Sequence, residues 1–201
     1  MTHPYPVTLE SHFAPRYQRI QVLYRVLWLA AIGILHQTVG GLFVALYLIL
    51  PVAAAISISR NRGSGFRPDD RRALVSVIDW AVSFYAYLLF VSDRVPVPPR
   101  DATTCLIVRP SGVPRVPGAV VRLVTTLPHA IVLCLLGFVA SLVAFAIAVV
   151  VLVTEVCPES LYTFQRDIVA WIGRVLAYHA SLVDAYPPFA LDGNERTAVR
   201  P

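Results

Sequence analysis

Residues 130–153 read AIVLCLLGFVASLVAFAIAVVVLV, and these 24 residues carry no charge. As a helix rising ~1.5 Å per residue, the stretch is about 36 Å long, which is enough to cross ~30 Å of hydrocarbon with some tilt. A helix in a soluble core does not need apolar side chains on every side. The stretch therefore predicts a protein integral to a membrane, and the other segments are interpreted around it.

The composition agrees with a membrane location. Of the 201 residues 57% are hydrophobic and 14% are charged, and all 17 basic residues are arginine. The arginines gather in loops beside apolar segments, where such residues serve anionic headgroups and topology, so nucleic-acid binding is not expected. Residues 1–19 contain several prolines and charges and have no apolar core like that of a signal peptide, so a signal peptide is not expected there. Three cysteines without a CxxC pair indicate neither a disulfide framework nor a zinc site. We expect a multi-pass protein of the bacterial inner (cytoplasmic) membrane.

The first half begins with a short strand candidate and continues with two apolar stretches. Tyr5–Phe13 alternates apolar and polar side chains, as a strand does. The apolar stretches 26–35 and 39–58 flank His36, and they fit either a hairpin of two tilted or half-depth helices or one long kinked helix. If all the basic segments are cytoplasmic, the hairpin is favoured, although the acidic loop at 155–159 breaks that charge pattern. After the basic loop 59–72, an amphipathic helix is expected over 73–91.

The second half repeats this order of segments. A proline-rich linker at 92–118 contains another strand candidate, Thr104–Val108. The apolar approach 120–127 and the Pro128-His129 pair lead into the central run. The acidic loop then precedes a last amphipathic helix over 161–183.

The final helices of the two halves share one spacing of residues. Four residues recur at a constant interval of 91: Trp80, Tyr87, Asp93 and Pro96 recur as Trp171, Tyr178, Asp184 and Pro187. We therefore predict an all-α integral membrane protein of two tandem pseudo-symmetric repeats, residues 1–99 and 100–192, with a polar tail at 193–201. Each repeat is expected to hold a short strand, a hydrophobic membrane hairpin or long helix, and an amphipathic aromatic helix.

The segments LPHAIVLCLLGF and VLAYHASLVDAYPPFAL resemble the bacterial membrane family catalogued as domain of unknown function 4389. The second half, about residues 104–191, resembles it closely through Pro128-His129 and the run 184–189. The first half resembles it more loosely, because Leu35-His36 lacks the proline and the run 93–98 lacks the tyrosine and phenylalanine. The resemblance implies the fold and a repeat, and it supplies no activity because the family is uncharacterised.

The two histidines in equivalent positions, His36 and His129, are candidate ligands for a haem or pigment. The commoner role for such a histidine is a hydrogen bond to a carbonyl at a helix turn or at the membrane interface, and no cofactor is predicted. The aromatic stripes Trp80/Tyr87 and Trp171/Tyr178 could hold a lipid or partner, but more often such residues anchor a helix at the headgroups or fill a core.

The remaining candidates are charges and small residues. Asp93 and Asp184 are expected to cap a turn or pair with an arginine such as Arg94. Asp79 and Arg174, charges within otherwise apolar helices, could serve a substrate path, but an intramolecular pair or snorkelling is favoured. Small residues at a spacing of four, which allow another helix to approach closely, are Ala140, Ala144 and Ala148.

No nucleophile–base pair, metal motif or phosphate-binding loop is present in the sequence, so we do not expect an enzyme. The leading hypothesis is a non-catalytic membrane accessory or scaffold subunit that associates with a larger membrane complex or with itself. One alternative is a small-molecule, lipid or ion carrier with its site between the repeats. A second is a haem- or pigment-binding electron-transfer subunit.

Overall fold

The computed structural model describes residues 5–13, 16–36, 40–61, 64–96 and 104–191, and it leaves the side chains of residues 28–36 undescribed. Helices make up most of this part of the chain. In order, the elements are β1 (Val7–Ser11), α1 (Arg19–His36), α2 (Gly40–Arg60), α3 (Pro68–Leu88), β2 (Thr104–Val108), α4 (Val116–Thr125), α5 (Leu127–Thr154) and α6 (Glu159–His179).

The two strands form one antiparallel sheet. Leu9 lies opposite Leu106, and the pairs extend from Val7–Val108 to Ser11–Thr104. The prediction of two short strands is therefore confirmed, and β2 has the predicted bounds. The chain is mostly helical as expected, but it is not all-α, because the strand of the first half pairs with the strand of the second in a short sheet.

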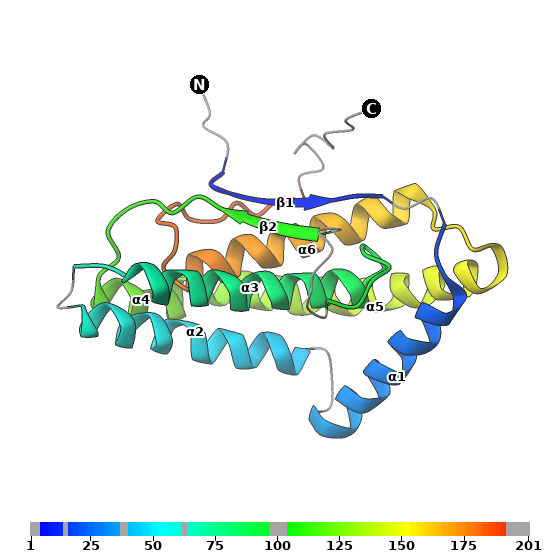
Figure 1. Ribbon diagram of the computed structural model, residues 1–201, viewed down its shortest axis with the longest axis horizontal. Coiled ribbons are helices and arrows are strands. Elements are labelled where there is room, and N and C mark those ends of the chain that lie inside the picture. Colours follow the sequence, from blue (N-terminus) through cyan, green and yellow to red (C-terminus); the bar gives the residue numbers. More distant parts are fainter. Residues whose placement is uncertain (1–4, 14–15, 37–39, 62–63, 97–103, 192–201) are drawn as a thin grey trace.

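The elements are arranged in layers (Figure 1). β1 packs on α6 and β2 packs on α3, and these two helices pack side by side. On the side away from the strands, α2 packs against α4 and α6, and α5 packs against α6. α1 runs obliquely away from this body and contacts α5. The amphipathic helices α3 and α6 thus lie between the sheet and the most apolar helices.

The amphipathic helices α3 and α6 end in the same way. The N–H of Phe90 bonds the carbonyl of Tyr87, and the N–H of Val91 bonds that of Ala86; Ser181 and Leu182 repeat this pattern at the end of α6. This is the Schellman arrangement, in which one residue adopts a left-handed conformation. Phe90 has φ 63° and Ser181 has φ 60°. The helices consequently end at Leu88 and His179, before the predicted ends at residues 91 and 183.

The two apolar segments are each broken into two helices. In the second half the break lies at Thr126, just before Pro128, whose ring nitrogen cannot donate to a carbonyl of the preceding turn. Near this break, the hydroxyl groups of Tyr47 and Tyr186 donate to the carbonyls of Leu123 and Thr125. In the first half, α1 and α2 are separate helices, and residues 37–39 between them are outside the described part. α2 and α5 are both long and apolar enough to cross a bilayer.

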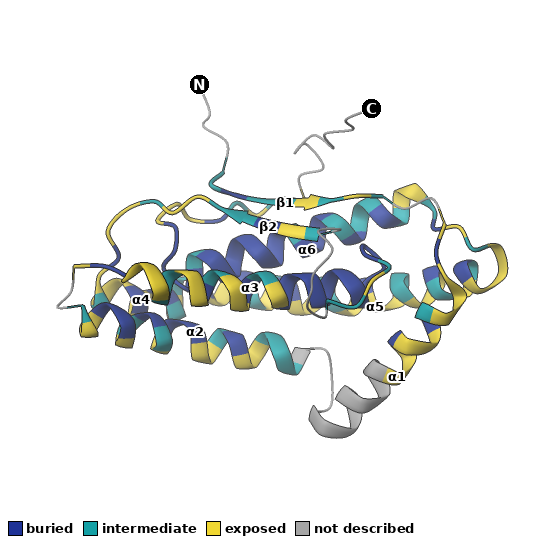
Figure 2. Cartoon of the chain, in the orientation of Figure 1, coloured by how far each residue is buried: buried dark blue, intermediate teal, exposed yellow. Residues whose placement is uncertain are grey.

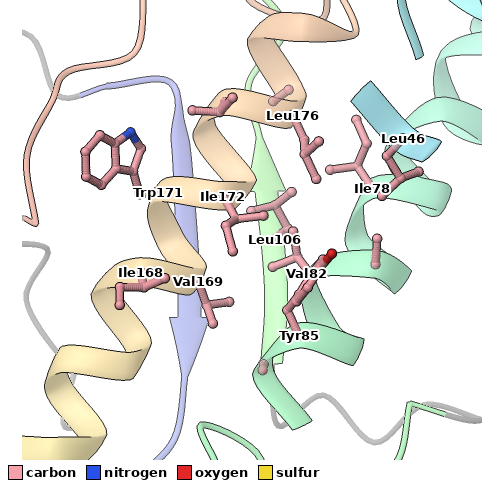
Figure 3. Packing of buried hydrophobic residues seen from close by; sticks show 14 of the residues in the cluster. Leu46, Ile78, Val82, Tyr85, Leu106, Ile168, Val169, Trp171, Ile172 and Leu176 are labelled. Carbon is pink, nitrogen blue, oxygen red and sulfur yellow. The ribbon is translucent and has the colours of Figure 1, made fainter. Parts of the chain in front are cut away.

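The core is packed around β2 and the facing surfaces of α3 and α6 (Figures 2 and 3). Leu106 of β2 points between these helices, toward Val82 of α3 and Gly173 of α6. A Cβ atom on Gly173 would lie 2.7 Å from Cδ1 of Leu106. The absence of a side chain at residue 173 therefore lets the strand approach the helix.

Candidate functional site

Arg122 of α4 holds the end of α6 and the segment that follows it. Its Nη1 donates to the carbonyls of Tyr178 (2.7 Å) and Val183 (2.6 Å), and its Nη2 donates to Oδ1 of Asp184 (2.5 Å). The guanidinium also lies 4.5 Å from the centre of the Tyr178 ring. A planar guanidinium suits this task, because it presents several donors at fixed angles and a face that stacks on an aromatic ring.

The loop after β2 holds Asp184 from the other side. The hydroxyl of Ser111 accepts a bond from the N–H of Asp184, and the N–H of Ser111 donates to the carbonyl of Leu182. Gly112 has φ +76°, and a Cβ there would lie 1.4 Å from Oδ2 of Asp184. The position therefore requires glycine both for its backbone and for the close approach of the carboxylate.

Arg25 of α1 makes the corresponding set of contacts in the first half. Its Nε donates to the carbonyl of Tyr87 (2.7 Å), and its Nη2 donates to the carbonyl of Ser92 (2.7 Å) and to Oδ1 of Asp93 (3.3 Å). Its guanidinium lies over the Tyr87 ring, at 4.5 Å. Asp93 also accepts from the N–H of Gln18. Burial raises the pKa of the Asp93 carboxyl, and these donors and Arg25 oppose the shift. Asp93 thus has a buried arginine as partner.

The C-terminal segment 184–190 docks along the helices. Its Phe189 ring stacks on His129 of α5 (3.8 Å between centres), and the hydroxyl of Tyr5 donates to the carbonyl of Ala185. Arg174 of α6 donates to the carbonyl of Ala190 at 2.8 Å. Together with the Arg122–Asp184 bond, these contacts fix the segment at both ends.

His129 is completely buried at the centre of this docking surface. Its Nδ1 accepts a bond from the indole N–H of Trp171 (3.2 Å), so the proton of the neutral ring is on Nε2. Nε2 itself has no hydrogen-bond partner among the described atoms. Tyr186 and Phe189 both lie against the ring. The ring is therefore packed among aromatic side chains, and the side chain of His36 lies outside the described residues.

A second buried histidine, His179, joins three helices. Its Nε2 bonds the carbonyl of Tyr47 in α2 (2.6 Å), and its Nδ1 bonds Oγ1 of Thr126 between α4 and α5 (2.9 Å). Since a carbonyl only accepts, Nε2 carries the proton. The Tyr47 ring stacks on the imidazole at 4.4 Å. Burial lowers the pKa of His179. The carbonyls of Tyr47 and Arg122 oppose this shift, and the positive charge of Arg122 adds a smaller lowering effect.

The other predicted residues make packing contacts or hydrogen bonds within the chain. Trp80 stacks on Phe84, and the Tyr87 ring is fully buried. Ala140 is buried against α6, where its carbonyl accepts from Gln165 (2.8 Å). Ala144 and Ala148 pack against the same core.

Asp79 and Arg174, the two helix charges singled out in the sequence, each bind a backbone group. Asp79 of α3 accepts a bond from the N–H of Leu106 in β2 (2.9 Å). Arg174 of α6 binds the carbonyl of Ala190, as described above. Asp79 therefore joins a helix to the sheet, and Arg174 joins a helix to the C-terminal segment.

A cavity of about 410 Å³ opens beside the Arg122 corner. The first turn of α4 forms one side of it, and Arg122, Ser181 and Asp184 form another. All of its lining residues lie between 113 and 184, within the second half.

The sequence reasoning missed Arg25, Arg122 and His179. Both arginines lie in or beside apolar stretches, where the local pattern indicates only charges that flank a membrane segment. A signal was present, however, because Arg25 follows Leu9 by 16 residues and Arg122 follows Leu106 by 16 residues. His179 has no counterpart in the first half, where residue 88 is leucine, and no spacing marked it.

Residues 117–190 match the family described as Domain of unknown function (DUF4389). The matched segment contains the complete Arg122–Asp184 corner, His129 and the docked C-terminal segment up to Ala190. No curated protein and no solved structure matches the chain. The comparison therefore assigns this segment to a family without a known activity.

Proposed function

We propose that this chain is a non-catalytic accessory or scaffold subunit of a bacterial cytoplasmic membrane, inserted through α2 and α5 and built from two tandem copies of one unit. The observation that carries the proposal is the contrast between its polar and apolar groups. The buried arginines and histidines bind helix ends and backbone carbonyls within the chain. The outward surface of four helices is instead apolar.

The tandem copies are supported by the equal intervals between corresponding features. α3 and α6 begin and end 91 residues apart, and so do the left-handed residues Phe90 and Ser181. The two strands and the two buried arginines are 97 residues apart. The three acceptors of Arg25 and the three of Arg122 again differ by 91. Leu9 and Leu106, also 97 residues apart, face each other at the middle of the ladder, as a two-fold relation between the copies would require.

A scaffold role is supported by the contacts that these residues make. Arg25, Arg122 and Asp79 each bind a backbone atom at the end of an element or at a strand edge. Such contacts fix the positions of helices, and they consume the groups that acid–base chemistry would need. A rigid frame with a large apolar exterior is suited to binding lipid, other membrane subunits or a second copy.

The test is a mild-detergent purification of the tagged chain from its native membrane, with identification of the proteins that copurify. The proposal predicts other subunits in fixed stoichiometry, or a homo-oligomer in cross-linking and mass measurements. The matched control is Arg122→Gln, which removes the corner that orders the second half and should reduce recovery of the partner. A monodisperse single chain, with no partner from native membranes, would contradict the accessory role. An absorption spectrum of the same sample tests the haem or pigment alternative.

A further inference from the structure

The exposed large apolar side chains are gathered on one side of the molecule. They lie mostly on α1, α2, α4 and α5, whereas β1 and β2 expose Glu10 and Cys105 (Figure 2). On α5 alone, Leu135, Phe138 and Phe145 are each more than two-thirds exposed. α3 and α6 separate this apolar side from the sheet (Figure 1).

The sheet has polar edges that hydrocarbon would not satisfy. A two-stranded ladder leaves outward N–H and C=O groups on both strands, and these groups need water or a protein partner. One of the outward groups, the N–H of Leu106, is bonded by Asp79. The strands also run along the lengths of α3 and α6 (Figure 1). If the helix axes were normal to the bilayer, the sheet would therefore lie beside α3 and α6 at hydrocarbon depth.

We propose that the face formed by α1, α2, α4 and α5 is the lipid-embedded side of the protein and that the β1–β2 sheet lies outside the hydrocarbon, in water. The occupant of the apolar face is the acyl-chain region of a bilayer. In this arrangement α2 and α5 lie along the bilayer with their exposed side chains in the hydrocarbon, and the polar sheet and the charged ends of α3 and α6 remain at the aqueous surface. The inference rests on the proposed membrane location and adds the direction in which the chain faces the membrane.

Two exposed cysteines, one on each side of the molecule, can be labelled to test this arrangement. Cys105 is exposed on β2, and Cys134 is exposed on α5. The third thiol, Cys157, is buried, and burial raises its pKa to about 11, so little reactive thiolate forms at neutral pH. Cys134→Ala and Cys105→Ala therefore leave one reactive thiol each, and the double variant measures any labelling of Cys157.

The experiment attaches the fluorophore NBD to each remaining thiol in full-length protein reconstituted into phosphatidylcholine–phosphatidylglycerol vesicles. Quenching is measured with nitroxide-labelled acyl chains and with iodide present on both sides of the vesicle. The proposal predicts at least threefold stronger lipid quenching at Cys134 than at Cys105, and the reverse order for iodide.

Three results would overturn the proposal. Strong lipid quenching at Cys105 would place the sheet within the hydrocarbon. Strong iodide quenching at Cys134 would place α5 in water, and protection of Cys134 from both quenchers would show that protein covers this face. Flotation of the same vesicles tests the membrane location separately, because protein that fails to float with lipid contradicts the proposed function itself, whereas floating protein with the wrong quenching contradicts only the orientation.

Discussion

Arg122 binds Asp184, 62 residues later in the chain, and the same guanidinium binds the carbonyls of Tyr178 and Val183 at the end of α6. One side chain therefore fixes α4, the end of α6 and the start of the C-terminal segment relative to one another. Its removal would take a donor from the carbonyl of Val183 and from the carboxylate of Asp184, and it would leave the carbonyl of Tyr178 with the N–H of Ser181.

We predict that Arg122→Gln destabilises the protein by about 2 kcal/mol, because the carbonyls of Tyr178 and Val183 lose a charged hydrogen-bond donor, whereas water can reach the half-exposed Asp184 carboxylate. For a chain of this size, the loss corresponds to a fall in melting temperature of roughly 4–8 °C, measured in detergent by intrinsic fluorescence. The exposed Arg115, seven residues earlier, is the matched control, and Arg115→Gln should change stability by less than about 0.5 kcal/mol. Equal losses in the two variants would contradict the structural role of Arg122.

The same substitution at Arg25 tests the relation between the two halves. Arg25 is almost fully buried and makes the corresponding three bonds. Arg25→Gln should therefore lower the melting temperature at least as much as Arg122→Gln. A loss no larger than that of Arg115→Gln would show that the two arginines do not have equivalent roles.

Gly112→Ala should separate the loop from Asp184. The new methyl group would overlap Oδ2 of the carboxylate, and the residue has a positive φ that alanine rarely adopts. We expect a loss of about 2 kcal/mol or more, within the range for strain and a disturbed ion pair. Gly118→Ala is the control, because nothing lies within 4 Å of its added Cβ and alanine favours a helix more than glycine does. Circular dichroism melts of both variants check the prediction, and similar losses in the two would contradict it.

Local patterns in the sequence predicted the elements better than their contacts. The strand Thr104–Val108 was predicted with its observed bounds, because its alternation and flanking residues are local signals. Its pairing with β1 joins residues 97 positions apart at the centre of the ladder, and no local pattern specifies such a partner. The predicted ends of α3 and α6 lie beyond the observed ends. Phe90 and Ser181 adopt the left-handed conformation that ends each helix, and the sequence has no glycine or asparagine there to indicate it.

The candidate site was predicted only in part for a similar reason. Asp93 and Asp184 were expected to cap a turn or bind an arginine, and each does bind one. The arginine in the ion pair with Asp93 is Arg25, which lies 68 residues earlier on an apolar helix. The stacking of Phe189 on His129 likewise depends on how the chain returns after α6, which is a tertiary property.

His179 predicts a pH dependence of stability. Its pKa in the folded protein is lowered by burial, below the unfolded value of ~6.5. The unfolded chain therefore binds a proton more readily than the fold does, so the contribution of this residue is present above about pH 6.5 and is lost as the pH falls below it. The melting temperature should fall from pH 7.5 to pH 5.5.

His179→Gln is the matched variant, since its amide can donate to the carbonyl of Tyr47 and does not titrate. It should show a smaller fall in melting temperature over the same pH interval than the parent protein. Identical pH dependences would mean that His179 does not contribute, and that other groups determine the acid sensitivity.

Ser181 and Phe90 occupy equivalent places after α6 and α3, yet we predict opposite effects when each is replaced by glycine. Both have a positive φ, which is unfavourable for a residue with a Cβ. The hydroxyl of Ser181 is also buried without a hydrogen-bond partner among the described atoms. Ser181→Gly removes the strain and the unsatisfied hydroxyl together, so it should stabilise the protein by about 1 kcal/mol.

Phe90→Gly relieves the same backbone strain but removes a buried ring that lies 4.0 Å beneath the guanidinium of Arg25. Truncating a buried phenylalanine costs about 3–5 kcal/mol, which exceeds the gain from the backbone. The melting temperature should therefore rise for Ser181→Gly and fall for Phe90→Gly, measured in the same detergent and buffer. A fall in both would show that the Ser181 side chain makes a favourable contact that outweighs its strained backbone.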